Sequence, residues 1–123
     1  MPKEKEKGRE FSAKGTVKRV QILYDTKRVK EAVAYLFLSY TKLVAEELKV
    51  EHKPSKTIRE LAIELVKKKD QNPEILYPFI QKVEETIYSG FPVRKEDLLQ
   101  AYDLFGKLYQ ALTNRSLNIS LRV

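Results

Sequence analysis

Residues 27–49, KRVKEAVAYLFLSYTKLVAEELK, decide the fold of this chain. Apolar side chains recur through this stretch at spacings of three to five residues, the pattern of a buried helical face. That face consists of Val29, Val33, Leu36, Tyr40, Leu43 and Leu48, and it is widened by Ala32, Phe37 and Val44. Because the stretch is apolar around much of its girth, it predicts a helix at the centre of a bundle. Asp25 or Thr26 is the candidate cap of its first turn.

A second helix is predicted by residues 57–69, TIRELAIELVKKK. Thr57 and Glu60 have the spacing of a capping box, in which each side chain accepts a hydrogen bond from the other residue's backbone N–H. The apolar face comprises Ile58, Leu61, Ala62, Leu65 and Val66. Three lysines follow in the last turn, where they suit the negative end of the helix dipole.

Proline and glycine positions delimit a third helix. Asn72 precedes Pro73, which is a cap followed by proline at the first helical position. Pro78 either kinks this helix or marks the start of its main part. We expect Gly90 to end the helix in the left-handed conformation, with Pro92 just beyond.

A fourth helix is predicted from about Lys95 to Leu112. Gly106 lies near its middle, where glycine costs about 1 kcal/mol relative to alanine. We therefore expect Gly106 to allow close packing against a neighbouring helix.

The two ends of the chain are less regular. Residues 1–10 are predicted to be a disordered tail, and residues 11–24 are ambiguous between helix and strand. Residues 116–123 alternate apolar and polar side chains, which is typical of a strand. Such a strand needs a partner, and the candidates are residues 16–24 or the same strand in a second copy.

These patterns predict an all-α fold, a bundle of about four helices, with a short terminal strand or strand pair as an open alternative. Three regions follow along the chain: a basic, partly disordered N-terminal segment at 1–24, a helical domain at 25–114 and an extended C-terminal tail at 115–123. A chain of 123 residues with 42% hydrophobic residues can bury a core without covalent staples.

Composition excludes several classes of function. The chain has no cysteine, so disulfides, thiolate nucleophiles and cysteine-based metal sites are excluded. No apolar run reaches the roughly 18–20 residues that span a bilayer, and the first ten residues do not resemble a secretory signal. We expect a cytoplasmic protein that is either free in solution or peripheral to the membrane.

Positive charge is concentrated at the N-terminal end. Residues 1–30 hold ten Lys/Arg and four Asp/Glu, a net charge of +6, within a total of +7. A basic segment favours an anionic partner such as nucleic acid, anionic lipid or an acidic protein. The alternative is a solvated tail that aids solubility. The candidate anion-binding residues are Lys14, Lys18, Arg19, Lys27 and Arg28, and they surround Tyr24.

The residues that commonly carry chemistry form no strong constellation. His52 is the only histidine, and we expect it to be a solvated loop residue. No second histidine and no cysteine could join it as a metal ligand, and none of the four glycines lies in a phosphate-binding loop, so neither a metal nor a cofactor is predicted. The remaining enzymatic hypothesis uses Arg59, Glu84 and Tyr88, with Glu84 placed to bond the Tyr88 phenol or an adjacent helix end.

Four stretches between residues 33 and 112 carry a resemblance. They are VAYLFLSYTKLV, TIREL, VEETIYSGFPV and EDLLQAYDLFGKL. Their order and spacing resemble the domain of unknown function number 4129, the C-terminal domain of transglutaminase-like membrane proteins of archaea and bacteria. The most specific positions are structural: Thr57 and Glu60 start a helix, and Tyr88, Gly90 and Pro92 end one.

The resemblance implies a cytoplasmic position after the last membrane helix of a larger protein, and a partner such as an AAA-type ATPase or a membrane protein. It implies no catalytic residues. This chain departs from the family in having no membrane helix and no transglutaminase-like part, which indicates a free-standing relative or an excised fragment. The chain also resembles the helical HEPN-type domains, but their Arg-x-x-x-x-His ribonuclease motif is absent because Glu47 stands five residues before His52.

The sequence therefore predicts a non-enzymatic protein-interaction or regulatory helical domain that is membrane-adjacent on the cytoplasmic side. The alternative is a nucleic-acid-binding accessory protein that acts through the basic N-terminal segment. A homodimer formed through the terminal strand is a further hypothesis.

Overall fold

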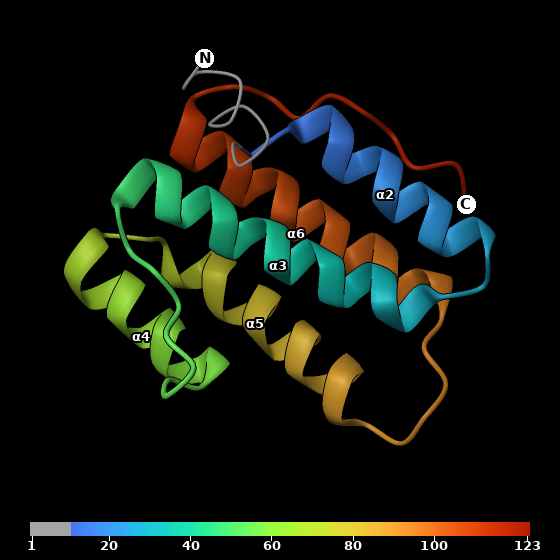
Figure 1. Cartoon of the computed structure of the whole chain (residues 1–123), viewed down its shortest axis with the longest axis horizontal. Helices are drawn as coiled ribbons and strands as arrows, with labels where there is room; N and C mark the ends of the chain where they lie inside the picture. Colours follow the sequence, from blue (N-terminus) through green and yellow to red (C-terminus); the bar gives the residue numbers. More distant parts are fainter. Residues whose placement is uncertain (1–10) are drawn as a thin grey trace, which may run out of the picture.

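The computed structural model describes residues 11–123, which form five helices (Figure 1). They are α2 (Ala13–Asp25), α3 (Val29–Leu48), α4 (Ile58–Lys69), α5 (Pro73–Tyr88) and α6 (Lys95–Thr113). The predicted all-α class is confirmed, and the described part of the chain contains no strand. The predicted disordered tail at 1–10 lies outside the described residues.

Helix α3 is the centre of the bundle, as its wide apolar stripe predicts. It packs against α2, α5 and α6, whereas α4 lies at the periphery and packs on α5 (Figure 1). Tyr40, Phe79 and Phe105 are fully buried where α3, α5 and α6 meet. The ring of Phe79 lies 5.6 Å from that of Tyr40 and 6.4 Å from that of Phe105, so one aromatic cluster joins the three helices.

The ambiguous residues 11–24 form most of α2, which raises the number of helices from about four to five. Ser12 caps this helix by accepting the backbone N–H of Gly15 at 3.0 Å. Its buried face, Thr16, Val17 and Val20, packs on α3, where the Thr16 hydroxyl donates to that of Ser39. Helix α2 runs through the predicted boundary between residues 24 and 25, so its basic side chains lie on the packed bundle.

The predicted cap of α3 is wrong for a related reason. Asp25 is the last residue of α2, and Thr26 is its C-cap, with a backbone N–H that donates to Ile22. The turn between α2 and α3 is made by Lys27, whose φ of 64° is left-handed. Arg28 then stands at the N-cap of α3 without a side-chain capping bond.

The starts of α4 and α5 follow their local signals. Thr57 and Glu60 form both hydrogen bonds of the capping box, each 3.0 Å long. Asn72 accepts the backbone N–H of Glu74 at 2.9 Å, and Pro73 is the first residue of α5. Pro78 lies inside α5, which is continuous from Pro73.

Two expectations about glycine are corrected. Gly90 is not left-handed, because α5 ends when Ser89 turns into an extended conformation and its hydroxyl accepts the backbone N–H of Phe91 at 3.0 Å. Gly106 does not serve close helix packing. A methyl group at its Cα would meet only Leu117, at an ordinary contact distance of 3.8 Å.

The predicted terminal strand is also corrected. Residues 114–123 lie outside any helix or strand, and Leu117, Ile119 and Leu121 are half-buried while the residues between them are exposed. The alternation therefore indicates a buried face, but that face packs on helices α2 and α6. The backbone N–H and C=O groups of these helices are already hydrogen-bonded within each helix, so they cannot form a ladder with the segment. Side chains replace the ladder: Gln21 bonds both backbone groups of Arg122, at 2.8 and 2.7 Å, and the Tyr102 hydroxyl donates to the Ile119 carbonyl.

Candidate interaction surfaces

The loop between α5 and α6 exposes two aromatic side chains. We call residues 88–93 the α5–α6 tip. Phe91 is 82% exposed and Tyr88 is 73% exposed, the highest exposure among the large hydrophobic side chains of residues 11–123. The bond from the Phe91 N–H to the Ser89 hydroxyl and the ring of Pro92 restrict the backbone between them. The tip therefore presents aromatic surface on a defined loop.

The residues on either side of the tip form polar bonds within the bundle. On the α5 side, the Arg59 guanidinium of α4 donates to the Glu84 carboxylate at 2.8 Å, and that bond raises the pKa of Arg59. On the α6 side, Asp97 accepts the backbone N–H of Arg94 at 3.0 Å and the ammonium of Lys82 at 3.3 Å. The hydrogen bond from the Arg94 N–H is the main cause of a lowered pKa of the Asp97 carboxyl, and the Lys82 ammonium lowers that pKa further.

A hollow of about 400 Å³ adjoins the tip. Its walls combine apolar groups of the tip with three carboxylates, and it is lined by Glu84, Glu85, Thr86, Tyr88, Ser89, Phe91, Pro92, Val93 and Asp97. The Arg59–Glu84 ion pair brings together TIREL and VEETIYSGFPV, two stretches that are separate in the sequence. Tyr88, Gly90 and Pro92, which the sequence assigns only to the end of a helix, thus belong to a loop that exposes aromatic side chains.

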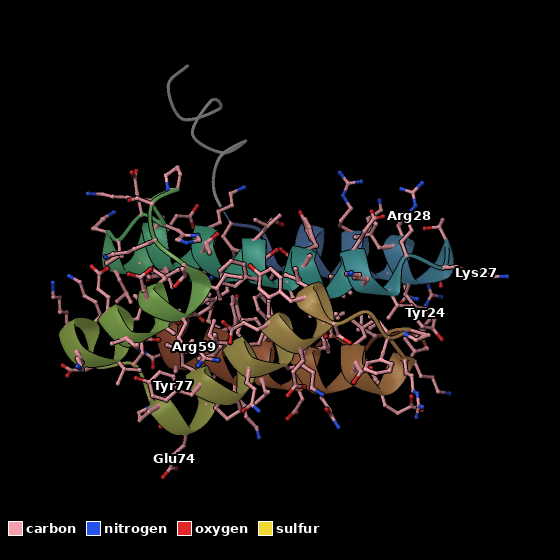
Figure 2. All side chains as sticks on the ribbon, turned by 90° about the horizontal axis from the view of Figure 1, so that it is seen from below. Tyr24, Lys27, Arg28, Arg59, Glu74 and Tyr77 are labelled. Carbon is pink, nitrogen blue, oxygen red and sulfur yellow. The ribbon has the colours of Figure 1, made fainter. Side chains whose placement is uncertain are left out.

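The structure distributes the five candidate anion-binding residues over three places. Lys14 and Lys18 lie one turn apart on α2 and line the same groove. Arg19 lies over the ring of Tyr35, with its guanidinium carbon 5.9 Å from the ring centroid. Figure 2 shows Lys27 and Arg28 near Tyr24 at one end of the bundle, where α2 turns into α3. The five residues therefore do not form one site.

The groove that contains Lys14 and Lys18 runs between α2 and the C-terminal segment. We call it the α2 groove, and its volume is about 540 Å³. Its lining comprises Lys14, Val17, Lys18, Gln21, Ile22, Asp25, Ile119, Ser120 and Arg122. Within residues 11–123, no carboxylate oxygen lies within 4.0 Å of the charged nitrogens of its three cations. The lining of the groove thus holds three cations and one carboxylate, that of Asp25, beside apolar side chains.

Of the two contacts that the enzymatic hypothesis proposes for Glu84, the structure contains one. Glu84 does bond an adjacent helix, through Arg59, but no hydrogen bond joins it to Tyr88 among the described residues. His52 is partly buried rather than solvated: its ring lies 5.9 Å from that of Phe37, and its Nε2 contacts the Lys56 carbonyl at 2.8 Å. In the described range, no group of three or more metal-ligating side chains is close enough to hold an ion.

Sequence reasoning found Lys14 and Lys18 by their charge but missed Ile22, Phe91 and Arg122. Phe91 lies inside the stretch VEETIYSGFPV, and its position between Gly90 and Pro92, two loop-forming residues, indicated that it would be exposed. Arg122 offered no local signal, because it reaches the groove through a contact between residues 101 positions apart.

Comparison with known proteins adds no assignment. No protein-family model, curated protein or solved structure matches the chain. Across residues 11–123, none of the helices combines the length and the apolar composition needed to cross a bilayer. The resemblance to the domain of unknown function number 4129 stays a prediction that rests on the quoted stretches.

Proposed function

We propose that this chain is a non-enzymatic protein-interaction domain that binds its partner through the α5–α6 tip. The observation that carries the proposal is the exposure of Phe91 and Tyr88, at 82% and 73%, on a loop in which the backbone N–H of Phe91 donates to the Ser89 hydroxyl. Aromatic side chains in water are costly to leave exposed and dominate binding energy when a partner covers them.

The geometry around the tip suits a protein partner. A restricted loop loses little conformational entropy on binding, which leaves more of the contact energy for affinity. The adjoining hollow offers space for a partner side chain, and the carboxylates along it provide a polar rim. The family resemblance supports an AAA-type ATPase or a membrane protein as the partner, in the cytoplasm and peripheral to the membrane.

The test compares capture by three immobilised proteins from native lysate, washed at low and then high salt. Phe91→Ser with Tyr88→Ser removes the aromatic surface, whereas Leu38→Ser removes another exposed apolar side chain, 60% exposed, from α3. We expect a protein captured by the wild type and by Leu38→Ser, resistant to salt, and lost by the tip variant. Equal capture by all three proteins would refute the role of the tip.

A second candidate function is nucleic-acid binding, and two lysines that line one groove, Lys14 and Lys18, favour it. Deletion of residues 1–30 would be a poor test, because it removes Val17 and Val20 from the core. The charge reversals Lys14→Glu and Lys18→Glu leave the core intact. Affinity for duplex DNA should fall steeply with salt in the wild type, since phosphate contacts release counterions, and the reversals should flatten that dependence.

A further inference from the structure

The α2 groove has a chemistry different from that of the tip. We propose that it is a second docking surface, which binds an acidic segment of a partner protein with an aliphatic side chain placed between its carboxylates. The groove is independent of the tip, since it is formed by α2 and the C-terminal segment rather than by α5 and α6. The proposal rests on apolar contact, on the placement of charge and on the absence of aromatic residues from the lining.

The apolar part of the groove is open to solvent at one residue. Ile22 is 46% exposed on α2, and the half-buried Ile119 lies in the same lining, whereas Val17 is only 6% exposed. Covering an exposed isoleucine is favourable by about 25 cal/mol for each Å² removed from water. A ligand for this groove should therefore bring an aliphatic group as well as negative charge.

The cations are spread along the groove rather than gathered at one point. Lys14 and Lys18 lie on the first half of α2, while Gln21 holds the backbone of Arg122 farther along the helix. Lys14 and Gln21 are seven positions apart, which corresponds to about 10 Å along the helix. Among the described residues of this lining, Asp25 is the one carboxylate, so the cations outnumber it three to one. A ligand with one anionic group would meet only part of this charge, whereas a peptide with several carboxylates can pair with more than one of the cations.

Nucleic acid fits the groove less well, although it also carries repeated negative charge. Its phosphates would pair with the cations but leave Ile22 uncovered. Single-stranded nucleic acid commonly stacks its bases on aromatic side chains, and the lining of the α2 groove has none. The combination of cations and aliphatic side chains thus favours an acidic protein segment.

The test is a titration of the isotope-labelled full chain, followed by ¹H–¹⁵N correlation spectra, which detect weak binding and locate it. Two synthetic peptides of equal length and charge are compared: one alternates glutamate with leucine, and the other alternates glutamate with serine. We expect the leucine peptide to shift the amide signals of α2 and residues 119–123 and to bind about tenfold tighter than the serine peptide. Equal affinities, or no shifts in this region, would overturn the proposal.

Three variants sharpen the result. Lys14→Glu with Lys18→Glu, and Ile22→Ser alone, should each weaken the leucine peptide about tenfold, because each removes one of the two kinds of contact. The matched control, Lys67→Glu with Lys68→Glu on α4, makes the same charge change on the opposite side of the bundle (Figure 1) and should leave binding unchanged. If an oligonucleotide binds tighter than the peptide and Ile22→Ser does not weaken it, the groove is a nucleic-acid site instead.

The two docking surfaces can fail separately. Phe91→Ser with Tyr88→Ser should leave peptide binding to the α2 groove intact. Loss of peptide binding in that variant would place the peptide on the tip and overturn the assignment of the groove.

Discussion

Tyr40 and Tyr88 bear the same side chain in opposite surroundings. Tyr40 is fully buried on α3 against Phe79, while Tyr88 projects into solvent from the α5–α6 tip beside Phe91. The aromatic residues around Tyr40 hold the helices together, whereas those of the tip have no comparable packing. The difference teaches that aromatic composition alone does not distinguish a core from a binding surface, and that substitutions can separate stability from binding.

The largest expected effect comes from paired substitutions in the two regions. Phe79→Ala should lower the free energy of unfolding by about 3–5 kcal/mol, because it empties the contact between α3, α5 and α6. Phe91→Ala should change it by less than about 0.5 kcal/mol, since an exposed side chain leaves no cavity. Urea unfolding followed by circular dichroism measures both. A large loss in Phe91→Ala would show that the tip supports the fold.

The capping box lies between these extremes. Thr57→Ala should cost about 1 kcal/mol, since the N–H of Glu60 loses its acceptor at the start of α4. The Glu60 carboxylate accepts a hydrogen bond from the Thr57 backbone N–H, and this bond is the main cause of the lowered pKa of the Glu60 carboxyl. That contribution is present above the ordinary pKa of glutamate and is lost as pH falls through the lower folded value. The penalty of Thr57→Ser should be smaller, because serine keeps the acceptor.

The hydroxyl of Tyr40 destabilises the core, whereas the exposed hydroxyl of Tyr88 has no such effect. The Tyr40 hydroxyl is buried and has no hydrogen-bond partner within the described residues, and burial raises its pKa above the ordinary value. Because the folded pKa exceeds the unfolded one, the unfolded chain ionises first as pH rises above about 10, and the protein loses stability there. Tyr40→Phe should stabilise the protein by about 1 kcal/mol at neutral pH, since an unpaired buried group is removed.

The same variant should also reduce the loss of stability at alkaline pH. It will not abolish it, because burial raises the pKa of Tyr102 as well. Urea unfolding of both proteins at neutral and alkaline pH measures the difference. A destabilised Tyr40→Phe at neutral pH would show that the hydroxyl has a partner.

The helices α4, α5 and α6 were predictable because their signals are local. The capping box at Thr57 and the pair Asn72–Pro73 place two helix starts within one residue of those in the structure. Helix α2 was not predictable with the same clarity, because its apolar residues fit both one helix face and an imperfect alternation, and Gly15 weakens both helix and strand. What decides it is packing on α3, a tertiary effect that propensity does not contain.

The tail and the α2 groove show where sequence reasoning stops. Alternation correctly identified the half-buried face of Leu117, Ile119 and Leu121, but a period of two does not say whether a strand or a helix covers that face. Asn118, with a φ of 52°, also interrupts a regular strand. The groove depends on contacts between the two ends of the chain, so charge in the sequence could reveal Lys14 and Lys18 but not their proximity to Arg122.

Gly106 offers the smallest expected effect and tests how tightly the tail is packed. A glycine in a helix costs about 0.5–1 kcal/mol relative to alanine, and the added methyl group would meet Leu117 at 3.8 Å, an ordinary contact. Gly106→Ala should therefore raise the free energy of unfolding by up to about 1 kcal/mol, measured by urea unfolding. Gly106→Val is the comparison, because a branched side chain would push against Leu117. If Gly106→Ala also destabilises the protein, residues 114–123 pack closer to α6 than the 3.8 Å distance indicates. The same residues form one wall of the α2 groove, so that wall would then be held more tightly.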